Sequence, residues 1–312
     1  MTWSALLRRH GILVGVAAVV AMVALVLAGW FVWRPADSES TPASPLPSPT
    51  APPSVSPSPT ASPTPSRTPK SAPVTAAPAG RRWAVKPGQP WQWQLTTPVN
   101  LDVDVPIYDI DGFDNSADVV RKLHNRGRRV ICYVEVGAAE DFRPDYQAFP
   151  KDVLGKPNGW EGERSVDIRR IDVLRPILAK RFDMCKAKGF DAIEPDLVAN
   201  YAEDTGFPIT AAHQLAFNRF VARLAHERGL AVALKNDPDQ VDELVGDFDF
   251  VVVEQCAEFD ECDQYLPFIR AGKAVLHVEY KLDRAAFCRE AKANRFSSMR
   301  KSLDLDAPRQ PC

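Results

Sequence analysis

Short apolar runs alternate with amphipathic stretches along the chain from residue 91 to the carboxyl terminus at residue 312. Continuous apolar runs are typical of strands buried in a parallel sheet, whereas apolar residues three or four apart indicate a helix with one buried face. The candidate strands are 91–95, 105–110, 129–136, 191–193, 231–235, 250–254, 274–280 and, with the weakest pattern, 296–303.

Helical patterns lie between most of these strands. Ser116 and Thr210 are favourable first residues for two of the helices, and Gly127, Gly189 and Gly229 are typical helix ends. The alternation predicts an α/β protein with a (β/α)8 TIM-like barrel. Because only about ten residues separate the first two strands, too few for a crossover helix, we expect the first unit to be degenerate. The expected helices are 116–126, 171–188, 210–228, 239–246, 261–270 and 283–294.

Residues 1–34 predict a cytoplasmic stub and a membrane anchor. Residues 12–33 contain no charged side chain and are long enough to cross a bilayer as a helix. Arg8 and Arg9 precede this run, so the positive-inside rule places the amino terminus in the cytoplasm. The run exceeds the usual core of a signal peptide, which favours an uncleaved anchor. We therefore expect a single-pass protein of the cell membrane whose remaining residues are extracytoplasmic, or a secreted protein if the helix is cleaved.

Residues 35–80 predict a disordered linker. This segment is rich in Pro, Ser and Thr and contains 14 of the 28 prolines of the chain. Such a composition cannot bury a core and favours an extended tether. The remaining residues, 81–312, are sufficient for one barrel domain.

Charge and motifs exclude several classes of function. A net charge of −2 and a pI near 6.2 predict no surface for nucleic acid. The sequence has no glycine-rich nucleotide motif, no Gly-x-Ser-x-Gly motif of serine hydrolases and no His-Glu-x-x-His metal motif. We therefore expect a protein that needs neither a cofactor nor a metal. We also expect it to be a monomer.

All six cysteines lie within the predicted extracytoplasmic domain, and an even number outside the cell indicates disulfides. Six cysteines allow many pairings, and the sequence alone leaves the choice open. Sequence proximity favours one pairing, in which a short loop is closed, the carboxyl terminus is pinned and a strand is tied to a helix. These pairs are Cys256 with Cys262, Cys288 with Cys312, and Cys132 with Cys185.

Polar side chains recur at the carboxyl ends of successive predicted strands, where barrels of parallel strands carry their chemistry. Any one of them is more often structural, but their recurrence at consecutive strand ends indicates a site. Asp196 and Glu254 end two such strands and would supply the paired carboxylates of a glycoside hydrolase. The other polar residues at strand ends are Asp109, Asp111, Tyr133, Glu135, Glu194, Lys235, Asn236, Glu279 and Tyr280.

Several motifs together resemble one family over most of residues 81–312. They include Trp-Gln-Trp-Gln-Leu (91–95), Tyr-Asp-Ile-Asp (108–111), Arg-Pro-Asp (143–145), Gly-Trp-x-Gly-Glu (159–163), Gly-Phe-Asp-Ala-Ile-Glu-Pro-Asp (189–196), Leu-Lys-Asn-Asp (234–237) and Glu-Gln-Cys (254–256). The sequence is similar to glycoside hydrolase family 114, the endo-α-1,4-polygalactosaminidases. This resemblance implies a (β/α)8 barrel that cleaves within α-1,4-linked galactosamine polymers. Relatives often carry Asn after the Pro-Asp pair, where this chain has Leu197.

The resemblance further implies that Asp196 and Glu254 are catalytic. We assign Asp196 as nucleophile and Glu254 as general acid/base of a retaining mechanism. A site rich in carboxylates would attract a cationic, deacetylated polymer, and Lys235 with Asn236 would bind a sugar hydroxyl or orient Asp196. Trp91 would stack on a sugar or pack in the core. The candidates for substrate binding are Asp109, Asp111, Tyr133, Glu135, Glu194, Lys235, Asn236, Glu279, Tyr280, Trp91 and Gln94.

Two alternatives stay open at this stage. The first is a surface domain that binds glycans without cleaving them, against which the presence of both Asp196 and Glu254 argues. The second is a hydrolase of a different amino-sugar or galactose polymer, because the rim of a barrel and not its fold sets specificity.

Overall fold

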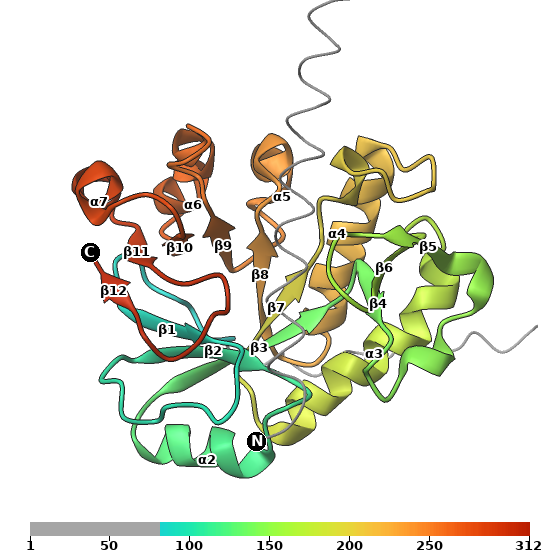
Figure 1. Cartoon of the computed structure of the whole chain (residues 1–312), viewed down its shortest axis with the longest axis horizontal. Helices are drawn as coiled ribbons and strands as arrows, with labels where there is room; N and C mark the ends of the chain where they lie inside the picture. The colour runs from blue at the N-terminus through green and yellow to red at the C-terminus, as the bar shows by residue number, and fades with distance from the viewer. Residues whose placement is uncertain (1–81) are drawn as a thin grey trace, which may run out of the picture. The chain divides into compact units, whose positions relative to one another are not determined.

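The computed structural model describes residues 82–312, which fold around a curled, parallel-rich sheet with helices on its outer face (Figure 1). No helix within this range is long and apolar enough to cross a membrane. The predicted span at 12–33 and the predicted linker at 35–80 lie outside the described residues.

The main sheet has the strand order β1-β2-β3-β7-β8-β9-β10-β11-β12. Neighbouring strands are parallel except β11 and β12, which pair antiparallel. Each of the eight predicted strands overlaps one of the eight parallel strands. Their bounds are β1 Trp91–Gln94, β2 Ile107–Asp111, β3 Arg129–Glu135, β7 Ala192–Asp196, β8 Ala231–Lys235, β9 Phe250–Glu254, β10 Val275–Glu279 and β11 Ser297–Arg300, followed by β12 Gln310–Pro311.

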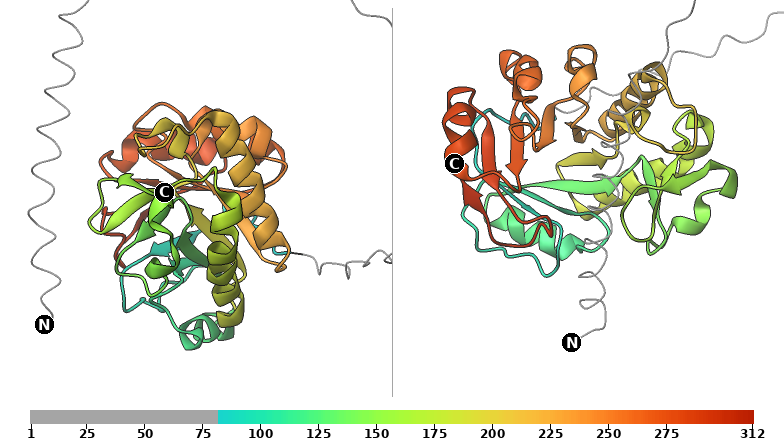
Figure 2. Two further views of the ribbon diagram at one scale, coloured as in Figure 1. Left: turned by 90° about the vertical axis from the view of Figure 1, so that its right-hand side faces the viewer. Right: turned by 45° about the horizontal axis from the view of Figure 1, so that its top comes forward.

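The first and eighth parallel strands approach each other, so the sheet curls back on itself (Figure 2). Trp91 Nε1 on β1 donates a hydrogen bond to the carbonyl of Ser297 on β11, at 2.7 Å. The segment after β11 adds a bond from Leu95 N to the Leu305 carbonyl at 3.0 Å. This arrangement is consistent with a TIM-like barrel.

Helices connect the parallel strands and lie on the outer face of the sheet. Thr210 caps α4, because its hydroxyl accepts the N–H of His213. Gly189 ends α3 at a φ of 92°, a left-handed conformation that glycine adopts without a steric penalty. The connection between β1 and β2 contains no helix, as its length predicts. The helices are α2 Ala117–Asn125, α3 Ile171–Lys188, α4 Ala211–His226, α5 Val241–Leu244, α6 Leu266–Arg270 and α7 Arg284–Ala293.

A second sheet of three short antiparallel strands is inserted between β3 and α3, and the sequence did not predict it. Its strands are β4 Ala138–Glu140, β5 Leu154–Pro157 and β6 Glu163–Val166, in the order β4-β6-β5. Strands this short give little periodicity, and β5 contains a glycine and a proline, which are rare in strands. The small sheet follows the carboxyl end of β3 (Figure 1), so it borders the candidate site.

Close packing between the ends of β3 and β7 requires a glycine at position 137. A Cβ atom there would lie 1.8 Å from the carbonyl oxygen of Leu197. The N–H groups of Val136 and Gly137 both donate to the carbonyl of Asp196, at 3.2 Å each. This contact fixes the end of β7, where Asp196 lies, against the end of β3.

The three disulfides confirm the favoured pairing. They join Cys132 with Cys185, Cys256 with Cys262, and Cys288 with Cys312. The first ties β3 to α3, and the last ties α7 to the carboxyl terminus.

Removal of Cys132–Cys185 is expected to destabilise the protein more than removal of Cys256–Cys262. The two bridges span sequence separations of 53 and 6 residues. Loop-closure entropy assigns about 4 kcal/mol to the longer loop and about 2 kcal/mol to the shorter one. Urea unfolding of the two double-alanine variants measures both free energies. A larger loss for the short loop would contradict this ranking.

Candidate active site

Lys235 lies at the centre of a group of carboxylates at the ends of β7, β8 and β9. Its Nζ atom is 3.1 Å from Asp196 Oδ1, 3.1 Å from Glu254 Oε2 and 3.3 Å from Glu194 Oε1. The lysine is 2% exposed. Burial opposes its charge, but the three carboxylates raise the pKa of Lys235 well above its usual value, so it stays protonated.

Asp196 is held as an ionised carboxylate. Burial raises its pKa, but Lys235, the hydroxyl of Tyr133 and the N–H of Leu197 together lower it below the usual value. The Tyr133 hydroxyl donates to Oδ2 at 2.8 Å, and the Leu197 N–H donates to Oδ1 at 2.7 Å. Leu197 has a φ of 59°, a conformation that asparagine adopts more readily than leucine. The departure from the family pattern therefore falls at the residue whose N–H binds Asp196.

Glu254 is oriented by three neighbours. Tyr280 donates its hydroxyl hydrogen to Oε1, and Lys235 contacts Oε2. The side-chain oxygen of Asn236 accepts the backbone N–H of Glu254 at 2.8 Å. Asn236 therefore positions Glu254, in addition to the two roles expected for it with Lys235, which were to bind a sugar hydroxyl or to orient Asp196.

The chain takes left-handed backbone conformations directly after three neighbouring strands of the site. The φ angles are 59° at Leu197, 49° at Asn236 and 60° at Gln255. Residues other than glycine are strained in this region, and such strain clusters at functional sites. The tight turns aim the side chains at the strand ends toward Lys235.

Asp109 and Glu194 form a fully buried pair of carboxyl groups beside Lys235. Both are 0% exposed, and apart from the contact between Lys235 and Glu194 Oε1 no basic group among residues 82–312 pairs with either of them. Burial and the charge of Glu194 raise the pKa of Asp109 well above its usual value. Burial also raises the pKa of Glu194 to about 7, against the opposing charge of Lys235. The pair therefore holds a proton near neutral pH.

Asp109→Asn is expected to flatten the pH dependence of thermal stability. A carboxyl whose pKa is raised from 4.5 to about 7 on folding binds a proton that the unfolded chain has lost, so stability falls as pH rises through this window. An asparagine removes one acid and donates to Glu194. The melting temperature between pH 5 and 7.5 should therefore fall less than in wild type. Asp102→Asn, at a side chain that is 86% exposed, is the control and should follow the wild-type profile.

Asp111 and Glu135 lie at the same rim, and each is next to a residue that the sequence analysis did not name as a candidate for the site. Asp111 is 3% exposed and accepts a 2.5 Å bond from Arg143 Nη2, whose Nε atom contacts Glu140 at 2.6 Å. Glu135 lies opposite Asp196 in the β3–β7 ladder and beside Glu163 of β6. Arg143 and Glu163 both belong to short motifs of the family resemblance, which was the available signal for them.

Three residues expected to bind substrate lie away from this group. Trp91 is 1% exposed and packs against Trp93. Of its two expected roles, the burial favours packing in the core. Gln94 is 2% exposed and bonds the carbonyls of Thr96 and Pro98, so it braces the β1–β2 connection.

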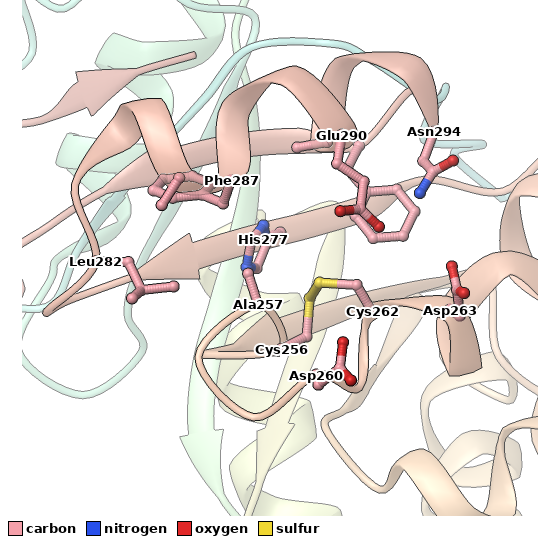
Figure 3. A pocket seen from close by; sticks show the side chains of 13 residues that line it. Cys256, Ala257, Asp260, Cys262, Asp263, His277, Leu282, Phe287, Glu290 and Asn294 are labelled. Atoms are coloured by element: carbon pink, nitrogen blue, oxygen red, sulfur yellow. A yellow bond between two sulfur atoms is a disulfide. The ribbon is translucent and has the colours of Figure 1, made fainter.

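Glu279 is the third, and it is 0% exposed. It accepts the N–H of Ala257 at 2.8 Å and contacts His277 Nε2 at 2.9 Å. His277 also lines a separate cavity of about 280 Å³ between the β9–α6 connection and α7, where it faces the Cys256–Cys262 disulfide (Figure 3). Glu279 therefore supports the connection after Glu254 and does not reach the rim.

Carboxylates brought together at the ends of neighbouring parallel strands are the arrangement that glycoside hydrolases use, so the fold and the site indicate this class of protein. Comparison with known families then identifies the family of glycoside hydrolases. The sequence model of Glycoside-hydrolase family GH114 matches residues 72–312, and the chain belongs to this family.

Solved structures agree with this membership. The structure of Aspergillus fumigatus Ega3 in complex with galactosamine is 34% identical, with a TM-score of 0.71 over 75% of this chain and 98% of that one. The glycoside hydrolase domain of PelA from Pseudomonas aeruginosa is 15% identical, with a TM-score of 0.55 over 70% of this chain and 96% of that one, and shows a shared fold. An uncharacterized protein of Deinococcus radiodurans is 28% identical over 192 residues, which span 56% of this chain and 60% of that protein.

Proposed function

We propose that this protein is an endo-glycosidase that hydrolyses α-1,4-linked galactosamine or N-acetylgalactosamine polysaccharide. Family membership supports the reaction, and the similarity to Ega3, whose structure contains galactosamine, supports the sugar. The observation that carries the proposal is the bridge that Lys235 makes between Asp196 and Glu254, which places two carboxylates at one point of the rim.

The spacing of these carboxylates supports a retaining mechanism. Asp196 Oδ1 and Glu254 Oε2 each lie 3.1 Å from Lys235 Nζ, so the two oxygens are at most about 6.2 Å apart. Carboxyl groups are roughly 5–5.5 Å apart in retaining enzymes and roughly 6.5–9.5 Å apart in inverting ones. The upper bound lies below the inverting range, and at the spacing of retaining enzymes there is no room for a water between the carboxylate and the sugar, so the carboxylate itself attacks.

The surroundings of Asp196 support its role as nucleophile, and Glu254 takes the other role as its partner. Asp196 receives three donors that keep it ionised, as a nucleophile requires. It attacks the anomeric carbon and forms a glycosyl ester while the bond to the leaving oxygen breaks. Glu254 gives its proton to that oxygen and then takes a proton from the water that hydrolyses the ester. Lys235 holds both groups in register throughout.

We further propose a fold, an oligomeric state and a location for the enzyme. The curled sheet forms a closed (β/α)8-type barrel, and the protein acts as a monomer without a metal or cofactor. Residues 12–33 anchor it in the cell membrane and residues 35–80 tether it outside the cytoplasm. The cysteine pairing supports an oxidising location, since disulfides persist outside the cytoplasm.

Product release by the purified full-length protein tests the function. Partly deacetylated α-1,4-galactosaminan should yield oligosaccharides of several lengths, and NMR of the first product should show an α-anomer. A β-anomer as first product would indicate inversion. Binding of the polymer without any product would favour the non-catalytic glycan-binding domain, and cleavage of other polymers alone would reassign the substrate.

A further inference from the structure

We propose that Glu135 and Glu163 form a binding site for the ammonium group of an amino sugar, directly beside Asp196. This inference rests on the proposed function and adds a determinant of specificity to it. Glu163 begins β6 and lies opposite Glu140 in the β4–β6 ladder, so the small inserted sheet brings it to the end of β3. Glu135 is the last residue of β3.

Within residues 82–312 neither Glu135 nor Glu163 makes an ion pair with a basic side chain, although the charge of Arg143 opposes the rise in the pKa of Glu163. Oxygens of Glu135, Glu140 and Glu163 lie within 4.8 Å of one another. Glu135 is 4% exposed, and its Oε2 atom is buried with no hydrogen-bond donor among residues 82–312. Burial, and then the charges of Glu163 and Glu140, raise the pKa of Glu135 well above its usual value. Two such groups side by side need a proton or a cation between them.

Access distinguishes this pair from the other buried carboxyl pair of the site. Asp109 and Glu194 are both 0% exposed and Lys235 already contacts Glu194, so a cation from solvent does not reach them. Glu163 is half-buried, and its Oε2 atom is fixed by Asn158 Nδ2 at 3.0 Å. A cation arriving from solvent can therefore reach the Glu135–Glu163 pair.

The neighbouring arginines favour an ammonium group over a divalent metal ion. Glu140 is already bound on one oxygen by Arg143 Nε at 2.6 Å and on the other by Arg181 Nη1 at 3.5 Å. A metal ion drawing on all three glutamates would lie against two guanidinium groups. Without Glu140, two carboxylates remain, which suit the single charge and the three donors of an ammonium group.

The position beside Asp196 identifies which ammonium group would bind there. Glu135 is the cross-strand neighbour of Asp196 on β3, whereas Lys235 contacts Asp196 from β8 on the other side. The C2 nitrogen of an amino sugar is attached next to the anomeric carbon that Asp196 attacks. Lys235 repels this charge, and the Glu135–Glu163 pair attracts it. A free amine gains this contact, whereas a neutral acetamide does not, so the pair selects deacetylated sugar at the cleavage point.

Glu163→Gln in the full-length protein tests this site, with Glu161→Gln as the matched control. Glu161 is an exposed residue of the turn that precedes β6. We expect Glu163→Gln to lower kcat/KM on fully deacetylated α-1,4-galactosaminan by about 10- to 100-fold more than on the fully N-acetylated polymer, the range of one charge-assisted hydrogen bond. Glu161→Gln should leave both values unchanged.

Three other outcomes would overturn the site. Equal losses on both polymers would assign Glu163 a structural role. Thermal stabilisation of chelator-treated wild type by millimolar Ca²⁺ or Mn²⁺, lost in Glu163→Gln, would assign it to a metal. If the wild-type protein cleaves neither polymer, the proposed hydrolase function is wrong, but the binding site can still be tested. Calorimetry then compares the affinity of the wild-type protein for galactosamine with its affinity for galactose. Equal affinity of the two sugars for wild type would then exclude it.

Discussion

Asp196→Asn and Glu254→Gln are each expected to reduce hydrolysis of a galactosamine polymer by about four orders of magnitude or more, the loss typical of a removed catalytic group. The first change replaces the attacking carboxylate by an amide that cannot form the glycosyl ester. The second removes the proton donor for the leaving oxygen. Both substitutions keep the shape of the side chain, so the folded structure should be retained. Initial rates of reducing-end release measure the loss, and circular dichroism checks the fold.

Alanine variants and azide separate the two roles. Azide in the space left by Asp196→Ala should attack the anomeric carbon and give a β-glycosyl azide from the α-linked substrate. In Glu254→Ala, azide should instead attack the intermediate formed on Asp196 and give an α-glycosyl azide. The reverse pattern would exchange the two assignments. Glu258→Ala, which changes a residue of the loop after β9 that binds Lys281, is the control and should stay active without azide.

Lys235→Met is expected to reduce kcat by about three orders of magnitude and to move the acidic limb of the pH–rate profile to higher pH. Removal of the lysine leaves Asp196, Glu254 and Glu194 side by side without their shared cation, which is costly at a buried site. Lys235 lowers the pKa of Asp196, so without it this carboxylate ionises only at higher pH. The profile of kcat/KM between pH 4 and 8 measures the shift.

Lys273→Met is the matched control for this substitution. Lys273 is a partly buried lysine whose Nζ atom donates to the carbonyls of Val245 and Phe248, away from the carboxylates. Its loss should lower stability and leave the pH–rate profile in place. A Lys235→Met profile with an unshifted acidic limb would show that the lysine acts only on stability.

The sequence was most informative where local chemistry decides structure. The strand patterns located all eight parallel strands, most clearly the apolar runs of β8 and β9, because strands buried on both faces are mostly apolar. Thr210 and Gly189 marked ends of α4 and α3, because capping and the left-handed conformation depend on the residue itself. The small sheet β4–β6 escaped notice because strands of three or four residues form through pairing with one another and carry little pattern of their own.

For the site, the sequence by itself determined which residues end the strands, and parallel order then brought Asp196, Lys235 and Glu254 to one rim. Only the tertiary structure decided which way each side chain points. It turned Glu279 toward the connection after Glu254, buried Trp91 and Gln94 in supporting roles, and brought Glu163 beside Glu135. The physical reason is that strand position follows from local pattern, whereas the partners of a side chain depend on residues distant in sequence.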